Sequence, residues 1–380
     1  MSYVRTALTL LLLAAPPFPI SAGGGLRTVW EMDLSKAIKE PAVDHDPGLP
    51  VFALRFSPDG SRIAVVADLY PVTGQLRSRL LIVNRDFPKD KPVQFEVPGG
   101  IDEGENSTPT PGFNWSAMGD RIVVAGQVFD LRDGRACALP ASGGGLLGDG
   151  HALTFDPADY PPMNFFDRIS HLLTYDSACR VTDRWEVHEA WLISDISQDR
   201  QRLLVRNSPQ SGSVTEEVLI VDPLSRTVLR RWPADTLWAQ VFADSGKAIC
   251  GARTAATPER LSPACFDGDT GARIGAASEV NGGLPMAAAT HSSRVVVSDY
   301  RRSLVPFSNG HQEVLARRVV WDFRSGKEMA SWHPSSQKYE FRFSKVPKTV
   351  SDPFRFAISP DGNYLAEGGN GILRLYAIEP

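Results

Sequence analysis

Seven histidines are the first residues that could carry out acid–base or metal chemistry. No two of them have the His-x-x-x-His spacing that directs two imidazoles at one metal ion. His188 has the most acidic surroundings, since it lies near Glu186 and Glu189, and in a strand Glu186 and His188 would share a face. The exposed edge of a strand explains this cluster at least as well as catalysis does. The seven are His45, His151, His171, His188, His291, His311 and His333.

Two acidic segments, Asp44–Asp46 and Asp102–Glu105, could supply oxygen ligands to Ca²⁺. Neither has the regular Asp-x-Asp-x-Asp-Gly register of a calcium loop. A third segment, Asp267–Asp269, is better interpreted as a hairpin turn, because Asp and Gly favour tight turns. The sequence therefore predicts no metal site and no cofactor.

Signatures of a serine nucleophile or a phosphate loop are also missing. No Gly-x-Ser-x-Gly occurs, and the glycine-rich run Ser142–Gly145 has no lysine behind it. Asn106 and Asn114 begin formal Asn-x-Ser/Thr acceptors for glycosylation. No catalytic residue is predicted.

Four cysteines are present, and none belongs to a Cys-x-x-Cys pair. Cys250 is the last residue of one strand-like run, and Cys265 lies within the next. Neighbouring strands would therefore bring the two cysteines together. A disulfide across a loop of about fifteen residues would contribute roughly 3 kcal/mol. Cys137 and Cys179 would then pair by elimination. The alternative is four buried free thiols.

The N-terminus has the three parts of a secretory signal peptide. Arg5 provides the positive charge, Ala7–Ala15 is apolar, and Ile20–Ala22 precedes a cut before Gly23. The apolar part is shorter than the ~20 residues of a membrane-spanning helix. We therefore expect a signal peptide over 1–22, a single domain over 23–380 and a secreted or periplasmic protein with no membrane span after cleavage. An uncleaved N-terminal anchor is the alternative.

The overall composition is that of a turn-rich globular chain. Apolar residues make up 42% and charged residues 22%, while 32 glycines and 29 prolines exceed the usual share. The formal charge is −4 and no basic stripe is present, so nucleic acid is not expected as a partner.

One element recurs along the chain: an apolar residue, a polar turn and a β-rich run. Pro opens the turn, Asp caps it and Gly adopts a positive φ, so the run folds back on the preceding strand as a hairpin. Three copies are strong and four are weaker, which predicts seven units and leaves six or eight as alternatives. The strong copies span 56–66, 115–124 and 358–366, and the weaker ones span 147–153, 196–204, 242–249 and 289–296.

A second element follows most copies of the first, as an apolar run that ends in Asp before another turn. Two hairpin turns give each unit about four strands, and about 51 residues of the mature chain are available to each of seven units. Four-stranded units that repeat around an axis are the blades of a β-propeller. The second element lies at 81–84, 128–134, 174–176, 220–225, 265–271 and 320–326.

The last unit stops after the run 371–378 and has no room for a fourth strand. The N-terminal run Leu26–Trp30 resembles the outer-strand run Ser225–Leu229. We therefore predict an all-β, seven-bladed β-propeller of four-stranded antiparallel blades, closed by the N-terminal strand. Such closure would remove an exposed edge.

The turns Phe56–Gly60 and Ile358–Gly362, together with Trp321 and Asp322 at the end of a third strand, resemble the WD-repeat superfamily and the Tol-type periplasmic propellers. The chain looks like a divergent bacterial WD-repeat-like propeller. The Gly-His dipeptide of strict WD repeats is absent. The resemblance implies the fold and a binding role, and it transfers no functional residue because the matched positions are turn and packing positions.

Two insertions, 156–166 and 335–351, carry aromatic residues together with proline or basic residues. Loops on a rigid scaffold often bind partners, so these two are the predicted contacts with an unknown protein or ligand. The alternative is that they cover a blade edge or fill the gap between blades. The predicted function is thus a secreted, non-catalytic scaffold. A propeller hydrolase or lyase with its site in the central channel is the alternative.

Overall fold

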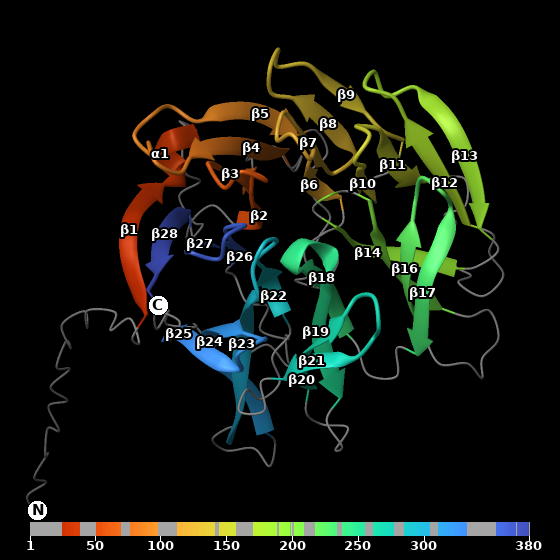
Figure 1. Ribbon diagram of the computed structural model, residues 1–380. Helices are drawn as coiled ribbons and strands as arrows, with labels where there is room; N and C mark the ends of the chain where they lie inside the picture. Colours follow the sequence, from red (N-terminus) through yellow and green to blue (C-terminus); the bar gives the residue numbers. More distant parts are fainter. Residues whose placement is uncertain are drawn as a thin grey trace, which may run out of the picture.

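The computed structural model is a seven-bladed β-propeller in which every blade is a four-stranded antiparallel sheet (Figure 1). This confirms the predicted fold and the count of seven. The first strands of neighbouring sheets contact one another, as β2 contacts both β6 and β26, so these strands form the inner ring. The structure describes residues 25–38, 51–69, 77–97, 112–140, 144–156, 170–187, 190–197, 199, 201–208, 217–233, 238–254, 261–276, 285–304, 311–332, 355–369 and 371–379.

Blades 1 to 3 use their strands in chain order from the inside outward. Blade 1 contains β2 (Val51–Phe56), β3 (Arg62–Leu69), β4 (Arg77–Asn84) and β5 (Val93–Val97). Blade 2 contains β6 (Phe113–Trp115), β7 (Arg121–Val124), β8 (Gln127–Asp130) and β9 (Ala136–Ala138). Blade 3 contains β10 (Gly144–Leu146), β11 (Ala152–Phe155), β12 (Ser170–Tyr175) and β13 (Val181–Val187).

Blades 4 to 6 follow the same order. Blade 4 contains β14 (Ala190–Ile196), β15 (Leu203–Ser208), β16 (Glu217–Asp222) and β17 (Thr227–Pro233). Blade 5 contains β18 (Trp238–Ala243), β19 (Ala248–Thr254), β20 (Leu261–Asp267) and β21 (Arg273–Ala276), with the 3₁₀ turn η2 (Asp244–Gly246) after β18. Blade 6 contains β22 (Pro285–Ala288), β23 (Arg294–Leu304), β24 (His311–Asp322) and β25 (Lys327–Trp332).

Blade 7 is completed by the N-terminal strand, as predicted. It contains β26 (Arg355–Ile358), β27 (Tyr364–Gly369), β28 (Ile372–Ile378) and, outermost, β1 (Leu26–Asp33), which pairs with β28 from Leu26–Ile378 to Asp33–Ile372. The short helix α1 (Leu34–Ile38) follows β1, and its Leu34 joins the apolar core between blades 7 and 1.

Five of the seven outer strands carry a β-bulge, because one extra residue interrupts the pairing of the third and fourth strands. Such bulges disrupt an exposed edge and hinder pairing with another chain. Two of the extra residues, Val29 and Leu229, are also among the exposed large apolar side chains. The five are Val29, Thr182, Leu229, Ile274 and Met329.

The two predicted disulfides are present, Cys137–Cys179 and Cys250–Cys265. Cys250 and Cys265 stand directly opposite each other in β19 and β20 of blade 5, as expected from their strand positions. Cys137 lies in β9 of blade 2, whereas Cys179 lies in the turn between β12 and β13 of blade 3. This second bond therefore joins two blades.

Helices contribute little to the described ranges. Within them, no helix combines the length and the apolar character needed to cross a bilayer. Residues 1–22, the predicted signal peptide, lie outside the described residues.

Candidate functional site

The two faces of the ring are built differently. In blades 1 to 6, the turn from the first to the second strand and the turn from the third to the fourth strand lie at the same end of the sheet, and blade 7 has its β26–β27 turn at this end. We call this end the turn face. The connections from the second to the third strand and from one blade to the next lie at the opposite end, which we call the loop face.

Carboxylates on the turn face serve the turns themselves. The hydroxyls of Ser57 and Ser359 each donate to the carboxylate two residues on, Asp59 and Asp361, at 2.5 Å. Burial pushes the pKa of both carboxyls upward, but hydrogen bonds from the serine hydroxyls and from nearby N–H groups outweigh it. Both pKa values therefore lie below the ordinary value.

The turns after the third strands follow the same logic. The side-chain hydrogen bond from Arg132 lowers the pKa of Asp130 to about 2. Asp267 accepts from the backbone N–H groups of Asp269 and Thr270, which confirms the interpretation of this segment as a hairpin turn. These groups stay ionised at neutral pH, so they act as fixed acceptors in turns.

Arginines tie neighbouring blades together on the turn face. The guanidinium of Arg62 donates to the carbonyl of Gly119 in the next blade, at 2.6 Å. Arg121 makes the same contact with Gly150, and Arg294 makes it with Gly362. Sequence reasoning missed this series, although a basic residue at the start of the second strand recurs in the printed repeats.

An ion pair crosses the central channel. Arg55 of β2 and Asp195 of β14 belong to the inner strands of blades 1 and 4, which are as far apart as two blades of a seven-membered ring can be. Their Nη2 and Oδ1 atoms are 3.4 Å apart, and the Asp195 side chain is 8% exposed. The second oxygen of Asp195 accepts from the backbone N–H of Phe242 in blade 5, at 2.9 Å. Both oxygens of this carboxylate are therefore engaged in holding inner strands.

Asn114 links the inner strands of blades 2 and 3 in the way that Asp195 links those of blades 4 and 5, by accepting from a backbone N–H of the next blade. Its side-chain oxygen accepts from the N–H of Leu146 at 3.0 Å, and the residue is 1% exposed. The formal glycosylation acceptor at Asn114 is thus buried in the folded chain. The other acceptor, Asn106, lies outside the described residues.

Of the residues grouped around His188 in the sequence, Glu186 is among the described residues, whereas Glu189 and His188 itself are not. Glu186 lies in β13 opposite His171 of β12, with Oε2 and Nε2 3.5 Å apart. The Glu186 side chain is 51% exposed, so this pair belongs to the outer rim. The contact between His171 and Glu186 could not be predicted from the sequence, because it depends on how β12 pairs with β13.

Several other candidate metal ligands lie outside the described residues. Both acidic segments, 44–46 and 102–105, lie outside the described residues, and so do His45 and His333. Within the described ranges, no three His, Cys, Asp or Glu side chains are grouped as metal ligands would be.

Blade 6 extends further from the loop face than its neighbours. β23 and β24 have 11 and 12 residues, and they pair with each other from Arg294–Asp322 as far as Leu304–His311. Within the described residues, β22 begins at Pro285, opposite Val297 of β23, and β25 ends at Trp332, opposite Arg318 of β24. Beyond Asp299–Arg317, five further pairs of β23 with β24 continue for about 17 Å. We call residues 300–304 and 311–315 the blade 6 ribbon (Figure 1).

Charged side chains brace the base of the blade 6 ribbon. Arg317 of β24 donates to Asp299 of β23 at 3.0 Å and to Glu328 of β25 at 2.8 Å. The Asp299 side chain is 3% exposed, so the contact to Asp299 is shielded from water. Three strands of blade 6 are thus linked at the level where the ribbon leaves the blade.

The next residue, Arg318, ties the same level to blade 7. Its guanidinium is 3.5 Å from Glu367 and lies over the ring of Phe356, and the residue is 1% exposed. Tyr376 donates to the other oxygen of Glu367 at 3.0 Å. Burial and the Glu367 carboxylate raise the pKa of Tyr376, so the hydroxyl keeps its proton and remains a donor.

The two insertions predicted to bind a partner begin and end on the loop face. The segment 156–166 follows β11 and precedes β12, and the segment 335–351 lies between β25 and β26. Apart from Asp156, the residues of both segments lie outside the described ranges.

Comparison with known proteins supports the fold alone. A scan against protein-family models and a search of curated protein sequences give no match. Among solved structures, a chain of a mitotic checkpoint complex is similar over 99% of this chain and 100% of its own length, with a TM-score of 0.51 and 14% identity. The Dos1 propeller matches 93% of this chain and 95% of its own, with a TM-score of 0.47 and 10% identity.

The chain is therefore a seven-bladed β-propeller, a class that includes many binding scaffolds.

Proposed function

We propose that this protein is an exported, non-catalytic scaffold that binds a partner protein on the loop face, with the blade 6 ribbon as the main contact. The observation that carries the proposal is the projection of this ribbon from a braced base. A long hairpin that is braced at its base by charged side chains suits contact with another chain.

The two faces support the same assignment. On the turn face, tight hairpins and inter-blade arginines use their polar groups internally. The loop face bears the connections that include 156–166 and 335–351, and loops on a rigid frame are where propellers vary. In the channel, Arg55 and Asp195 neutralise each other, which favours a structural role over an acid–base role for that carboxylate.

Export is supported by the disulfides and by the N-terminal sequence. Disulfides persist in oxidising compartments and are rare in the cytosol. Both bonds and the apolar segment Ala7–Ala15 fit a protein that leaves the cytosol with its leader removed. N-terminal sequencing of the mature protein tests this part: we expect Gly23 as the first residue, and an uncleaved Met1 in the exported fraction would contradict it.

The partner site is tested by photo-crosslinking in cells of the producing organism. A photoreactive residue is placed at 302 or 312 in the ribbon, and at 118 on the turn face as a control, because Met118 is 85% exposed. We expect a defined protein adduct from the ribbon positions and none from position 118. Adducts from position 118 alone would overturn the assignment of the loop face.

A matched variant then measures the contribution of the ribbon. Tyr300 and Leu315 are cross-strand partners, so residues 301–314 can be replaced by an Asn-Gly turn without altering the base. The affinity for the crosslinked protein should fall at least about tenfold, a loss of roughly 1.4 kcal/mol. Met118→Ala should leave the affinity unchanged. An excised variant that keeps its affinity and its melting temperature would refute the ribbon as the main contact.

A further inference from the structure

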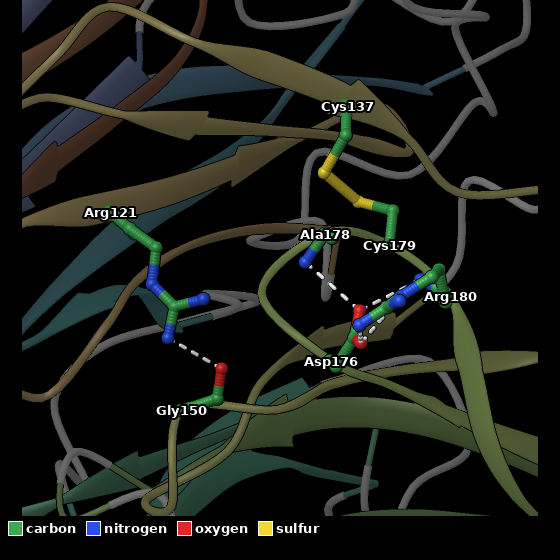
Figure 2. The surroundings of a disulfide bond; sticks show 7 residues. All are labelled: Arg121, Cys137, Gly150, Asp176, Ala178, Cys179 and Arg180. Carbon is green, nitrogen blue, oxygen red and sulfur yellow. Dashed lines mark hydrogen bonds and ion pairs between the residues drawn. A yellow bond between two sulfur atoms is a disulfide. The ribbon is translucent and has the colours of Figure 1, made fainter.

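The disulfide Cys137–Cys179 is the covalent link between blades 2 and 3. Cys137 lies in the three-residue outer strand β9, and Cys179 lies in the turn between β12 and β13 (Figure 2). The Cα atoms are 5.9 Å apart and the two residues are 42 positions apart in the sequence. Both side chains are half-buried and lie against the outer part of the apolar cluster between these blades.

Cys179 occupies a position that other blades give to glycine. Its backbone N–H donates to the carbonyl of Asp176, three residues earlier, whereas Gly134, Gly271 and Gly326 donate to the carbonyl of the turn aspartate four residues earlier in the longer turns of blades 2, 5 and 6. Like those glycines it has a positive φ, of 58°. A cysteine stands where the turn geometry favours glycine, and its sulfur reaches the neighbouring blade.

Without the disulfide, the interface between blades 2 and 3 would keep an apolar cluster and a few polar contacts. Among the described residues this cluster has seven buried members, compared with fourteen between blades 7 and 1 and five between blades 4 and 5. The remaining polar contacts include Arg121 with the Gly150 carbonyl and Asn114 with the Leu146 N–H. Figure 2 shows the first of these beside the disulfide.

The second disulfide provides an internal reference. Cys250 and Cys265 are 1% and 0% exposed, and they join two adjacent strands of one blade that are already hydrogen-bonded. A thiolate must reach a sulfur atom to exchange with it, so exposure governs which bond reacts. The inter-blade bond is the accessible one of the two.

We propose that Cys137–Cys179 is a reversible redox clamp, whose reduction by a dithiol loosens the interface between blades 2 and 3 while the remaining six interfaces stay closed. One thiolate of the dithiol attacks a sulfur of the pair and forms a mixed disulfide, and the other cysteine leaves as a thiolate. The second thiol of the reductant then attacks the mixed disulfide. The products are two protein thiols and the oxidised dithiol, a transfer of two electrons and two protons.

Reduction exposes a defined part of the fold. With the bond broken, the short strand β9 would still pair with β8, and the turn at Cys179 would still be closed by hydrogen bonds within residues 176–180. The neighbouring strands β7, β8, β11 and β12 contribute the apolar side chains that the disulfide covers. Local opening should therefore be confined to these strands. The inference does not depend on which partner binds the loop face.

The test titrates the oxidised protein with dithiothreitol and follows each cysteine by alkylation and peptide mass spectrometry. We expect Cys137 and Cys179 to become alkylated at a roughly tenfold lower reductant concentration than Cys250 and Cys265. At that concentration, amide hydrogen exchange should rise in residues 121–138 and 152–180 and stay constant in blades 5 to 7. Reoxidation should restore the original exchange.

Matched variants separate the clamp from general destabilisation. Cys137→Ser with Cys179→Ser should reproduce the exchange pattern of the selectively reduced protein, and should no longer respond to low dithiothreitol. Cys250→Ser with Cys265→Ser should keep the response. Simultaneous reduction of both disulfides, or selective reduction without any change in exchange at blades 2 and 3, would overturn the proposal. The titration of the natural chain decides the matter even where a variant fails to fold.

Discussion

Substitution of Leu34 would test whether the N-terminal segment holds the ring closed. It is the first residue of α1, fully buried at 0% exposure, and it packs among residues of blades 7 and 1. Its backbone N–H also donates to the Gly371 carbonyl at 2.8 Å. Leu34→Ala removes the apolar side chain and leaves the backbone contact in place. The buried leucine and the cavity left behind give an expected loss of about 2–5 kcal/mol.

The assay is equilibrium unfolding in urea. It measures the change in the free energy of unfolding, and the dependence of this free energy on urea concentration should be the same in the variant and the parent. Val29→Ala is the matched control, because Val29 lies in the neighbouring strand β1 but is 41% exposed at a bulge. The control should stay within about 0.5 kcal/mol of the parent chain. Equal effects of the two substitutions would refute the view that the segment after β1 closes the interface between blades 7 and 1.

Three further predictions concern the inner ring and the turns. Gly145→Ala should lower the free energy of unfolding by about 1–3 kcal/mol, because the new Cβ would lie 2.0 Å from Nδ2 of Asn114. Thermal unfolding measures this loss, and an unchanged melting temperature would show that this inner strand can shift. Asp195→Ala should lower the free energy of unfolding by about 1–3 kcal/mol, because the buried backbone N–H of Phe242 loses its acceptor and Arg55 loses its partner. Asp195→Asn should recover part of this loss, because the amide oxygen can still accept. The Asp130 carboxyl has a folded pKa of about 2, below its ordinary value of 3.8, so its stabilisation is present above about pH 4 and is lost as the pH falls towards 2. Asp130→Asn should therefore be less stable than the parent by under 1 kcal/mol at pH 7 and approach it near pH 2. A difference that does not change with pH would contradict this.

The repeat could be predicted from sequence because its turns have strong local requirements. The segments at 56–60 and 358–362 need residues that open a turn, cap it and adopt a positive φ, and Gly60 and Gly362 have φ values of 72° and 77°. The closure by β1 followed from counting strands in the last unit. The disulfide between Cys250 and Cys265 followed from their places in consecutive strands.

Contacts between blades were not predictable in the same way. The link from Arg62 to Gly119 and the pair of Arg55 with Asp195 depend on which blades are neighbours and on the width of the channel. Strand pairing beyond the turns also escaped sequence reasoning. His171 meets Glu186 only because β12 and β13 pair in one particular register, and the blade 6 ribbon depends on how far β23 and β24 continue to pair.

The position of β28 between β1 and β27 has a consequence for how the chain matures. The strand Ile372–Ile378 pairs on one side with the first strand of the chain and on the other with β27. Until it has been synthesised, two strands from opposite ends of the chain lack their common partner, and unpaired edges favour aggregation. Loss of β1 leaves one such edge, whereas loss of β28 leaves two. A truncation that removes Ile372–Ile378 would thus be more damaging than one that removes Leu26–Asp33.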